Sequence, residues 1–285
     1  FAETIKETAE LYPDVTFIAL DVAQGDLGED YTVPSNVYCA VYQEELCGYM
    51  AGYAAVKLGY THLGVLVGMA VPAVQRFGYG FVQGTEAAAV EMGIADQVVM
   101  EYAYGNQFYG DSDITADMDN WYQTLGVEVV FASGGWYTNG TEIVFACGGG
   151  IYTSAAEAAA KVGGKLIGVD VDQSANIDTY REGMCVTSAM KGLAETVKHM
   201  LGEVVAGNFA NYGGQVETLG LVNGDDPTAN YVQLPMETTQ WGDGFTQDDY
   251  KALVKAMYDG DVTVSNDISA MPATTITVNF AGNIK

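Results

Sequence analysis

The chain has 285 residues, of which 37 are acidic and 11 are basic, so its formal net charge is -26. Binding to nucleic acids requires clustered Lys and Arg residues, and docking on anionic lipid is favoured by the same clusters, so this balance argues against both partners. Apolar residues make up 49% of the chain, which is enough to build a folded protein with two lobes of ordinary domain size.

Helical and strand patterns alternate along most of the chain. Apolar runs that end in a polar residue are typical of buried parallel strands, whereas a period of three to four residues indicates a helix. In chain order, we predict a helix over 1–12, strands over 15–21 and 36–42, a helix over 44–59, a strand over 62–68, a helix over 72–93, a strand over 97–105, a helix over 112–126, a strand within 128–147, a helix over 154–164, a strand over 165–172, a strand and then a helix within 183–207, and a helix over 245–261.

One strand and its glycine turn occur almost twice. Glu128-Val-Val-Phe-Ala-Ser-Gly-Gly is followed by Glu142-Ile-Val-Phe-Ala-Cys-Gly-Gly. Neighbouring parallel strands need a crossover of a dozen or more residues, and the link between Ala132 and Glu142 is too short for one. The two copies therefore form at most an antiparallel hairpin, or one copy is displaced as a loop. We predict that the second copy occupies the sheet, because it continues directly into the next helix, and that the first copy is a surface insertion.

Strands that alternate with helices through short links predict an α/β fold with a doubly wound parallel sheet. In such sheets, ligands bind beyond the carboxyl ends of the strands. This rule selects Asp21 and Asp170, which each close an apolar strand, and Gly148 in the triple-glycine turn. Gly148 either lets the backbone approach a ligand closely or simply turns the chain into the next helix.

The candidate side chains have both functional and structural interpretations. Asp21 and Asp170 can accept hydrogen bonds from the vicinal hydroxyls of a sugar, or they can cap the next helix. Phe77 can stack on a flat ring or belong to the core, and Phe81, one turn further along, fits the core better. Lys191 can donate to a sugar oxygen or orient a neighbouring aspartate, or it can be a surface lysine.

No catalytic or metal-binding motif occurs in the sequence. It contains no G-x-S-x-G, H-E-x-x-H, P-loop or EF-hand pattern, and no G-x-G-x-x-G follows the first predicted strand. The four cysteines lack C-x-x-C spacing, so we expect buried free thiols. We therefore expect a binding protein that is not an enzyme and that uses no cofactor and no metal.

Six segments follow one another in the order found in a known family. They are YPDVTFIALD, NVYCAVYQEELCGYMAGYAA, LGVLVGMAVPAVQRFGYGFVQGTEAA, VFACGGGIYTSAAEAA, LIGVDVDQ and VTSAMKG. From residue 1 to about 225 the chain resembles the BMP/PnrA-like family of basic membrane proteins, which are substrate-binding lipoproteins of ABC importers for nucleosides. The resemblance implies a type I periplasmic-binding-protein fold, with two Rossmann-like lobes of parallel sheet joined by a hinge.

The resemblance also implies boundaries for the two lobes. Lobe I would contain residues 1–40 and 188–215, and lobe II would contain residues 41–187 and 216–285. The family's opening strand and a ligand-contacting loop should precede Phe1. We therefore expect lobe I to lack its first strand-helix unit.

Five residues take on roles through the resemblance. Asp21 looks like the acid that contacts the base, and Phe77 looks like an aromatic residue that packs on it. Gly148 is similar to the backbone that closes over the ligand. Asp170 and Lys191 look like the pair that holds the ribose hydroxyls.

The implied function is that of an extracytoplasmic binding protein for nucleosides, with a purine as the expected base. Its partners would be the nucleoside and an ABC transporter permease, and it would act as a monomer. It would reach the membrane only through an N-terminal lipid anchor that is not present in this chain. Two alternatives remain at this point, which are a binding protein of the same fold for sugars or other small molecules, and a ligand-sensing regulatory module.

Overall fold

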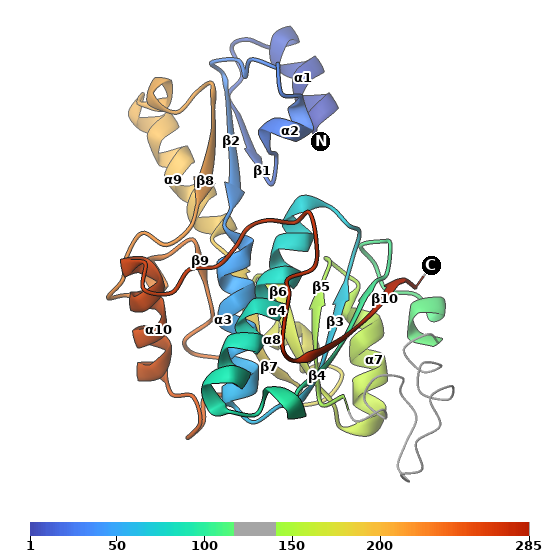
Figure 1. The fold of residues 1–285 in the computed structure, drawn as a ribbon. Coiled ribbons are helices and arrows are strands. Elements are labelled where there is room, and N and C mark those ends of the chain that lie inside the picture. Colours follow the sequence, from blue (N-terminus) through green and yellow to red (C-terminus); the bar gives the residue numbers. More distant parts are fainter. Residues whose placement is uncertain (117–140, 285) are drawn as a thin grey trace.

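The computed structural model describes residues 1–116 and 141–284. They form an α/β structure with two mainly parallel sheets, of which the smaller lies above the larger in Figure 1. The smaller sheet has the strand order β1-β2-β8, and the larger sheet has the order β10-β4-β3-β5-β6-β7-β9. The predicted α/β class with parallel sheets is therefore confirmed.

The smaller sheet is covered by helices on both faces. Its strands are β1 Phe17–Leu20, β2 Val37–Tyr42 and β8 Gln215–Leu219, and its helices are α1 Ala2–Leu11, α2 Gln24–Leu27 and α9 Leu193–Ala206. Neighbouring residues of β2 face opposite sides of the sheet, as the pleat requires. Cys39 packs in the cluster that contains Leu27 of α2. Its neighbour Tyr38 packs in the cluster that contains Met200 of α9.

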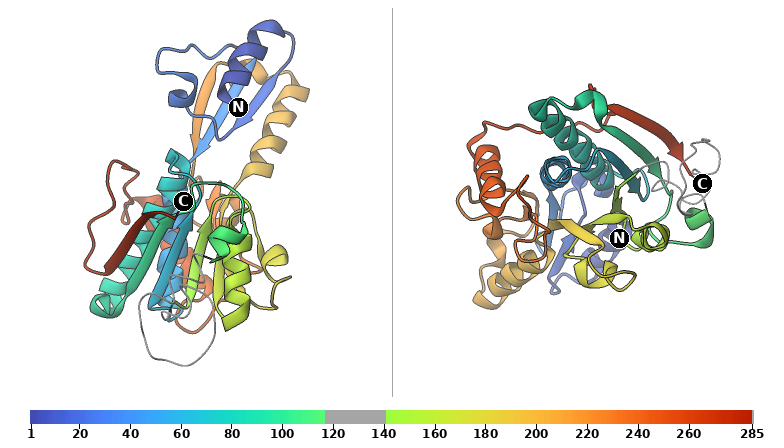
Figure 2. Two further views of the ribbon diagram at one scale, coloured as in Figure 1. Left: turned by 90° about the vertical axis from the view of Figure 1, so that its right-hand side faces the viewer. Right: turned by 90° about the horizontal axis from the view of Figure 1, so that it is seen from below.

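The larger sheet is also a buried layer between helices. Its strands are β3 His62–Val67, β4 Val99–Tyr104, β5 Ile143–Cys147, β6 Lys165–Asp170, β7 Cys185–Lys191, β9 Val232–Gln233 and β10 Thr277–Asn283. The main helices on it are α3 Glu44–Lys57, α4 Pro72–Met92 and α7 Tyr152–Val162. Phe145 of β5 packs in the cluster of α3 and α4, whereas Val144 and Ala146 pack in the cluster of α7. Figure 2 shows α4 and α7 on opposite faces of this sheet.

Further helices complete the structure around the sheets. They are α8 Ser174–Ile177, α10 Gln247–Asp259 and the 3-10 helices Ala95–Gln97, Phe209–Asn211 and Pro227–Ala229. Thr246 caps α10 by accepting a hydrogen bond from Asp249 N. β9 pairs antiparallel with β7, and β10 pairs parallel with β4 at the edge of the large sheet.

Helices α3 and α4 pack with their backbones in close contact. A Cβ atom on Gly48 of α3 would lie 2.2 Å from Phe77 O, and one on Gly80 of α4 would lie 2.2 Å from Glu45 O. Only glycine permits so close an approach at these two points. The contact places the N-terminal turn of α3, with Glu44 and Glu45, against the turn of α4 that carries Phe77.

The second copy of the repeated segment occupies the sheet, as predicted. β5, Ile143–Cys147, lies between β3 and β6, with Leu63 opposite Ile143 on one side and Ile143 opposite Lys165 on the other. The first copy, 128–133, lies outside the described residues, and so does the part of the predicted helix 112–126 that follows residue 116. Residues 112–116 are helical.

The chain passes between the two sheets in the segments that follow β2, β7 and β8. Gln43 N donates to Leu219 O at 2.9 Å, and Gly192 N donates to Tyr231 O at 2.7 Å, so these segments are hydrogen-bonded to one another. The lobe boundary expected at residue 215 falls at the first residue of β8, which pairs with β2 of the smaller sheet. The division of the chain into two lobes with these boundaries remains a proposal.

Candidate ligand-binding site

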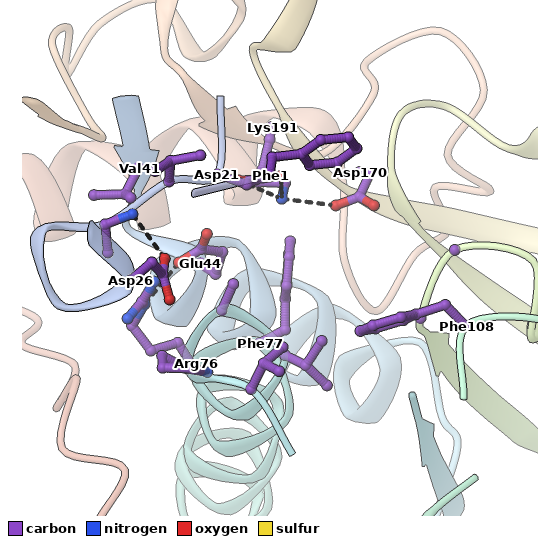
Figure 3. Close-up of a pocket in the computed structure, with 18 of the residues that line it drawn as sticks. Phe1, Asp21, Asp26, Val41, Glu44, Arg76, Phe77, Phe108, Asp170 and Lys191 are labelled. Carbon is purple, nitrogen blue, oxygen red and sulfur yellow. Dashed lines mark hydrogen bonds and ion pairs between the residues drawn. The ribbon is translucent and has the colours of Figure 1, made fainter. Parts of the chain in front are cut away.

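A cavity of about 690 Å³ lies where strands of both sheets end (Figure 3). The residues that follow β1 and β5, and the last residues of β6 and β7, contribute to its wall, together with the first turns of α4. All five residues selected from the sequence line this cavity, namely Asp21, Phe77, Gly148, Asp170 and Lys191. The structure thus brings them together, and their roles toward a ligand remain proposals.

Lys191 lies between two aspartates. Its Nζ donates to Asp21 Oδ1 at 2.9 Å and to Oδ2 at 2.8 Å, and it lies 3.1 Å from Asp170 Oδ1. The Lys191 side chain is 4% exposed, whereas those of Asp21 and Asp170 are 40% and 36% exposed. Lys191 is therefore not a surface lysine. Because Asp21 follows β1 and Asp170 ends β6, this ammonium joins the two sheets.

The charge of Lys191 is maintained by its partners. Burial alone would lower the pKa of Lys191, but the attraction of Asp170 and Asp21 outweighs burial and raises the pKa above the ordinary value of 10.5. Lys191 is therefore a cation at neutral pH. It offers a strong hydrogen-bond donor, and the two exposed carboxylates beside it offer acceptors.

The two aspartates adopt an unusual backbone conformation. Asp21 has a φ of 57° and Asp170 a φ of 67°, which is the left-handed region that few residues other than glycine adopt. Such backbone strain is concentrated at functional sites. The helices that follow are served by other carboxylates, because Asp26 accepts from Ala23 N and Asp172 accepts from Ser174 N. The helix-cap interpretation of Asp21 and Asp170 therefore loses its support.

Phe77 belongs both to the core and to the cavity wall. Its ring packs edge-to-face with Phe145, at a centroid distance of 6.2 Å, and Lys191 Nζ lies 5.5 Å from the centroid of the Phe77 ring. Phe81 is fully buried and stacks on Phe145 at 5.0 Å, so its prediction as a core residue is confirmed. The sequence did not single out Phe108, an exposed ring in the loop after β4 that also lines the cavity.

Gly148 is required by the contact of two loops. A Cβ atom at this position would lie 2.7 Å from Gly68 N and 2.8 Å from Gly68 Cα. Gly68 N also donates to Cys147 O at 2.8 Å, which holds the loops after β3 and β5 together. The backbone of Gly148 therefore forms part of the cavity wall.

A second charged cluster in the cavity was missed from the sequence. Arg76 Nε donates to Glu44 Oε2 at 2.7 Å and lies 3.9 Å from Glu45 Oε2. Burial raises the pKa of Glu44 despite the nearby cations, and burial also raises the pKa of Glu45 to about 7. The available signal was the pair of glutamates at the start of an otherwise apolar helix, in a chain with only 11 basic residues.

The charges that line the cavity disfavour an anionic ligand. Among the described residues that line it, five have carboxylate side chains and two have cationic side chains, namely Glu3, Asp21, Asp26, Glu44 and Asp170 against Arg76 and Lys191. Both cations are already paired with carboxylates. A neutral ligand with several hydroxyl or amide groups fits such a lining, because it can exchange hydrogen bonds without adding charge.

Within the described residues, no group of three or more His, Cys, Asp and Glu residues is arranged to hold a metal ion. The four cysteines are buried and free, as expected. No helix among residues 1–116 and 141–284 has both the length and the apolar character needed to span a bilayer.

Two mainly parallel sheets, each covered by helices, share one polar cavity, and this arrangement is that of the type I periplasmic-binding-protein fold. The sequence profile of the ABC transporter substrate-binding proteins described as PnrA-like matches residues 1–225, and the chain belongs to this family. It is a family of solute-binding proteins and not of enzymes.

Individual relatives agree with this assignment. The chain is 27% identical over 216 residues to Basic membrane protein B of Borreliella burgdorferi, with 74% of this chain and 55% of the relative covered. It thus spans about half the length of the curated relatives that it matches.

Solved structures show the same fold. An ABC transporter solute-binding protein from Conexibacter woesei superposes with a TM-score of 0.64 at 22% identity, over 93% of this chain and 76% of that chain. A transcriptional activator of the comK gene from Bacillus halodurans superposes with a TM-score of 0.60 at 17% identity, over 96% of this chain and 77% of that chain.

Proposed function

We propose that this chain is the ligand-binding part of an extracytoplasmic receptor that delivers nucleosides to an ABC importer. The observation that carries the proposal is the position of Lys191, between Asp21 and Asp170 and 5.5 Å from the centroid of the Phe77 ring. A nucleoside combines vicinal hydroxyls with a flat ring. The cavity offers a donor and acceptors for the hydroxyls beside an aromatic face for the ring.

The proposed contacts follow from this arrangement. Asp170 and Lys191 would hold the ribose hydroxyls, because a carboxylate accepts from both members of a diol while the ammonium donates to an oxygen. Asp21, expected to contact the base, shares the same ammonium and is therefore also within reach of the sugar. Phe77 would pack on the base, which we expect to be a purine, and the backbone at Gly148 would close over the ligand.

Closure of the two sheets around the ligand is part of the proposal. The ammonium of Lys191 belongs to the larger sheet and Asp21 to the smaller one, so a ligand bound here contacts both sheets at once. Such hinge closure would present a changed outer shape to the permease. We propose in addition that the receptor is a monomer and that an N-terminal lipid anchor holds it at the membrane.

Two other functions fit parts of the cavity. The Lys191 cluster alone would suit a free sugar, which needs no aromatic partner for a base. A ligand-sensing regulatory module is suggested by the likeness to the comK activator structure, but that likeness, at 17% identity, concerns the fold alone. The nucleoside proposal uses both the polar cluster and Phe77, and for that reason we favour it.

A panel of ligands separates these functions. We expect purine nucleosides to raise the melting temperature of the protein, and free ribose, galactose and free bases to leave it unchanged. At 100 times its dissociation constant, a ligand stabilises the folded state by about 2.7 kcal/mol, which is readily measured. A shift with ribose or galactose, without one for any nucleoside, would contradict the proposal and support the sugar alternative.

A further inference from the structure

The cluster around Arg76 forms a second polar end of the cavity. Figure 3 draws Arg76, Glu44 and Asp26 at the end opposite Asp170, with Phe77 between Arg76 and Phe108. Arg76 directly precedes Phe77 on α4. A flat ring that packs on Phe77 therefore has an apolar neighbour in Phe108 and a hydrogen-bonding neighbour in Arg76.

The guanidinium of Arg76 is held from one side only. Its Nε donates to Glu44 Oε2 at 2.7 Å, and Glu44 is fully buried in the first turn of α3, where α3 and α4 are in backbone contact. A charge-assisted bond to a buried carboxylate fixes the orientation of the planar guanidinium. The Arg76 side chain keeps 19% of its surface exposed. Across the described ranges, its Nη atoms make no hydrogen bond, so these donors are available to a ligand.

Glu44 lines the cavity, and it also fixes the orientation of Arg76. Its carboxylate is shielded from solvent, and its Oε1 has no hydrogen-bond partner among the described residues. The other carboxylate oxygen of Glu44, Oε2, accepts from Arg76 Nε at 2.7 Å. Glu44 is therefore a positioning residue.

An arginine has five N–H donors and no acceptor, so its free edge can pair only with an acceptor. Hypoxanthine, guanine and uracil carry an oxo group where adenine and cytosine carry an amino group. An amino group facing Arg76 would place donor against donor. A phosphate is a poor alternative partner for Arg76, because the described residues that line the cavity contribute five carboxylates against two cationic side chains.

We propose that Arg76, oriented by Glu44, reads the base of the bound nucleoside and selects bases with an oxo group over bases with an amino group at the same position. This inference rests on the nucleoside-binding function proposed above and adds a specificity to it. The ribose end would be placed by Lys191, and the base would then extend along Phe77 toward Arg76.

The test compares ligand pairs that differ at this one position. Affinities of inosine and adenosine, and of uridine and cytidine, are measured by calorimetry with the whole chain. We expect the oxo member of each bound pair to bind about ten-fold more tightly, which is within the range found for arginine contacts to base edges. Binding of the two members with equal affinity would overturn the inference, whereas binding of no nucleoside at all would overturn the function on which it rests.

Arg76→Lys is the decisive variant. It keeps a cation beside Glu44, so folding should persist, but a single ammonium cannot both pair with Glu44 and present a fixed edge. We expect the ten-fold ratio to fall to about three-fold or less, while the amino nucleoside still binds as before. Arg181→Lys is the matched control, because Arg181 lies outside the cavity and donates to Gly163 O.

A double variant covers the case in which Arg76→Lys does not fold. Glu44→Gln together with Arg76→Gln replaces the ion pair by neutral side chains of similar size and removes the buried charge. The oxo preference should again be lost. If either variant keeps the wild-type ratio for both ligand pairs, Arg76 does not read the base.

Discussion

Replacing Lys191 by Met removes the cation that joins Asp21 beside the smaller sheet to Asp170 in the larger one. Methionine has nearly the same length and is apolar, so the buried part of the side chain still fills its space. The two carboxylates then face each other without a counter-charge. The substitution therefore tests the electrostatics of the cluster with little change in packing.

The effect of Lys191→Met on stability depends on how exposed Lys191 and its two partner carboxylates are. Removing one partner of a fully buried ion pair costs about 3–5 kcal/mol, and removing one of an exposed pair costs about 0–1 kcal/mol. Lys191 is 4% exposed, but its partners are 40% and 36% exposed and are partly solvated by water. We therefore expect Lys191→Met to lower the free energy of unfolding by about 1–2 kcal/mol.

The sign of the pH dependence can also be stated. The folded-state pKa of Lys191 is raised above 10.5, so its contribution to stability is complete below pH 10.5 and is lost as the pH rises through the folded-state pKa. The difference between Lys191→Met and the wild type should therefore be the same at pH 6 and pH 8. Ligand affinity should fall by about 10- to 150-fold, because one charged hydrogen-bond donor is lost.

Urea unfolding measures the stability change, and calorimetry with a nucleoside measures the affinity. Lys198→Met is the matched control, since Lys198 lies on the exposed surface of α9 and its nearest carboxylate, on Glu195, is 3.5 Å away. The control should leave both quantities unchanged. If Lys191→Met also leaves both unchanged, the cluster neither joins the sheets energetically nor contacts the ligand, and the reasoning from its geometry is wrong.

Two further substitutions test the surroundings of the cavity, and a third, on α9, is a control for the second. Burial raises the pKa of Glu45 to about 7, so the wild type loses stability as the pH rises from 4.5 through 7. Glu45→Gln does not ionise. It should therefore have wild-type stability near pH 4.5 and be more stable than the wild type by up to about 3 kcal/mol at pH 8. Equal urea midpoints of variant and wild type at pH 8 would contradict this. Gly148→Ala should cost about 1–3 kcal/mol and weaken ligand binding, since its Cβ would lie 2.7 Å from Gly68 N. Gly202 lies in the interior of α9, and no atom of the described residues lies within 4 Å of the position of an added Cβ. Gly202→Ala should therefore stabilise the protein by about 0.5–1 kcal/mol. If Gly202→Ala instead lowered the stability, the space around the Cβ would not explain the cost of Gly148→Ala.

Elements with strong local patterns were predictable from the sequence. β5 is an unbroken run of buried apolar residues, and α4 begins at Pro72 and ends at Gly93, which has a φ of 69°. The rule that ligands bind at the carboxyl ends of parallel strands then selected Asp21, Gly148 and Asp170, which all line one cavity. In these cases the local sequence pattern and the tertiary structure favour the same secondary structure and the same site.

Elements whose stability comes from distant partners were not predictable. β8 and β10 are mostly exposed or half-buried edge strands, and each is defined by its pairing with β2 or β4. The ion pair between Glu44 and Arg76 joins residues 32 positions apart, and its cause is the close contact of two helices at glycines. Local periodicity contains neither kind of information.

Lys191 and Arg76 are both paired with carboxylates, but they differ in the hydrogen-bonding groups that they leave available to a ligand. Each is paired with carboxylates before any ligand arrives, so a ligand gains affinity by replacing or extending hydrogen bonds and not by neutralising charge. At Lys191 the carboxylates are partly exposed and belong to the two sheets, so they are available to hydroxyl groups and sensitive to how the sheets are arranged. At Arg76 the partner carboxylate of Glu44 is buried, and the guanidinium itself offers N–H donors. One end of the cavity therefore offers both donors and acceptors to a ligand, whereas the arginine at the other end offers donors alone, and a ligand with a diol at one end and an acceptor at the other satisfies both.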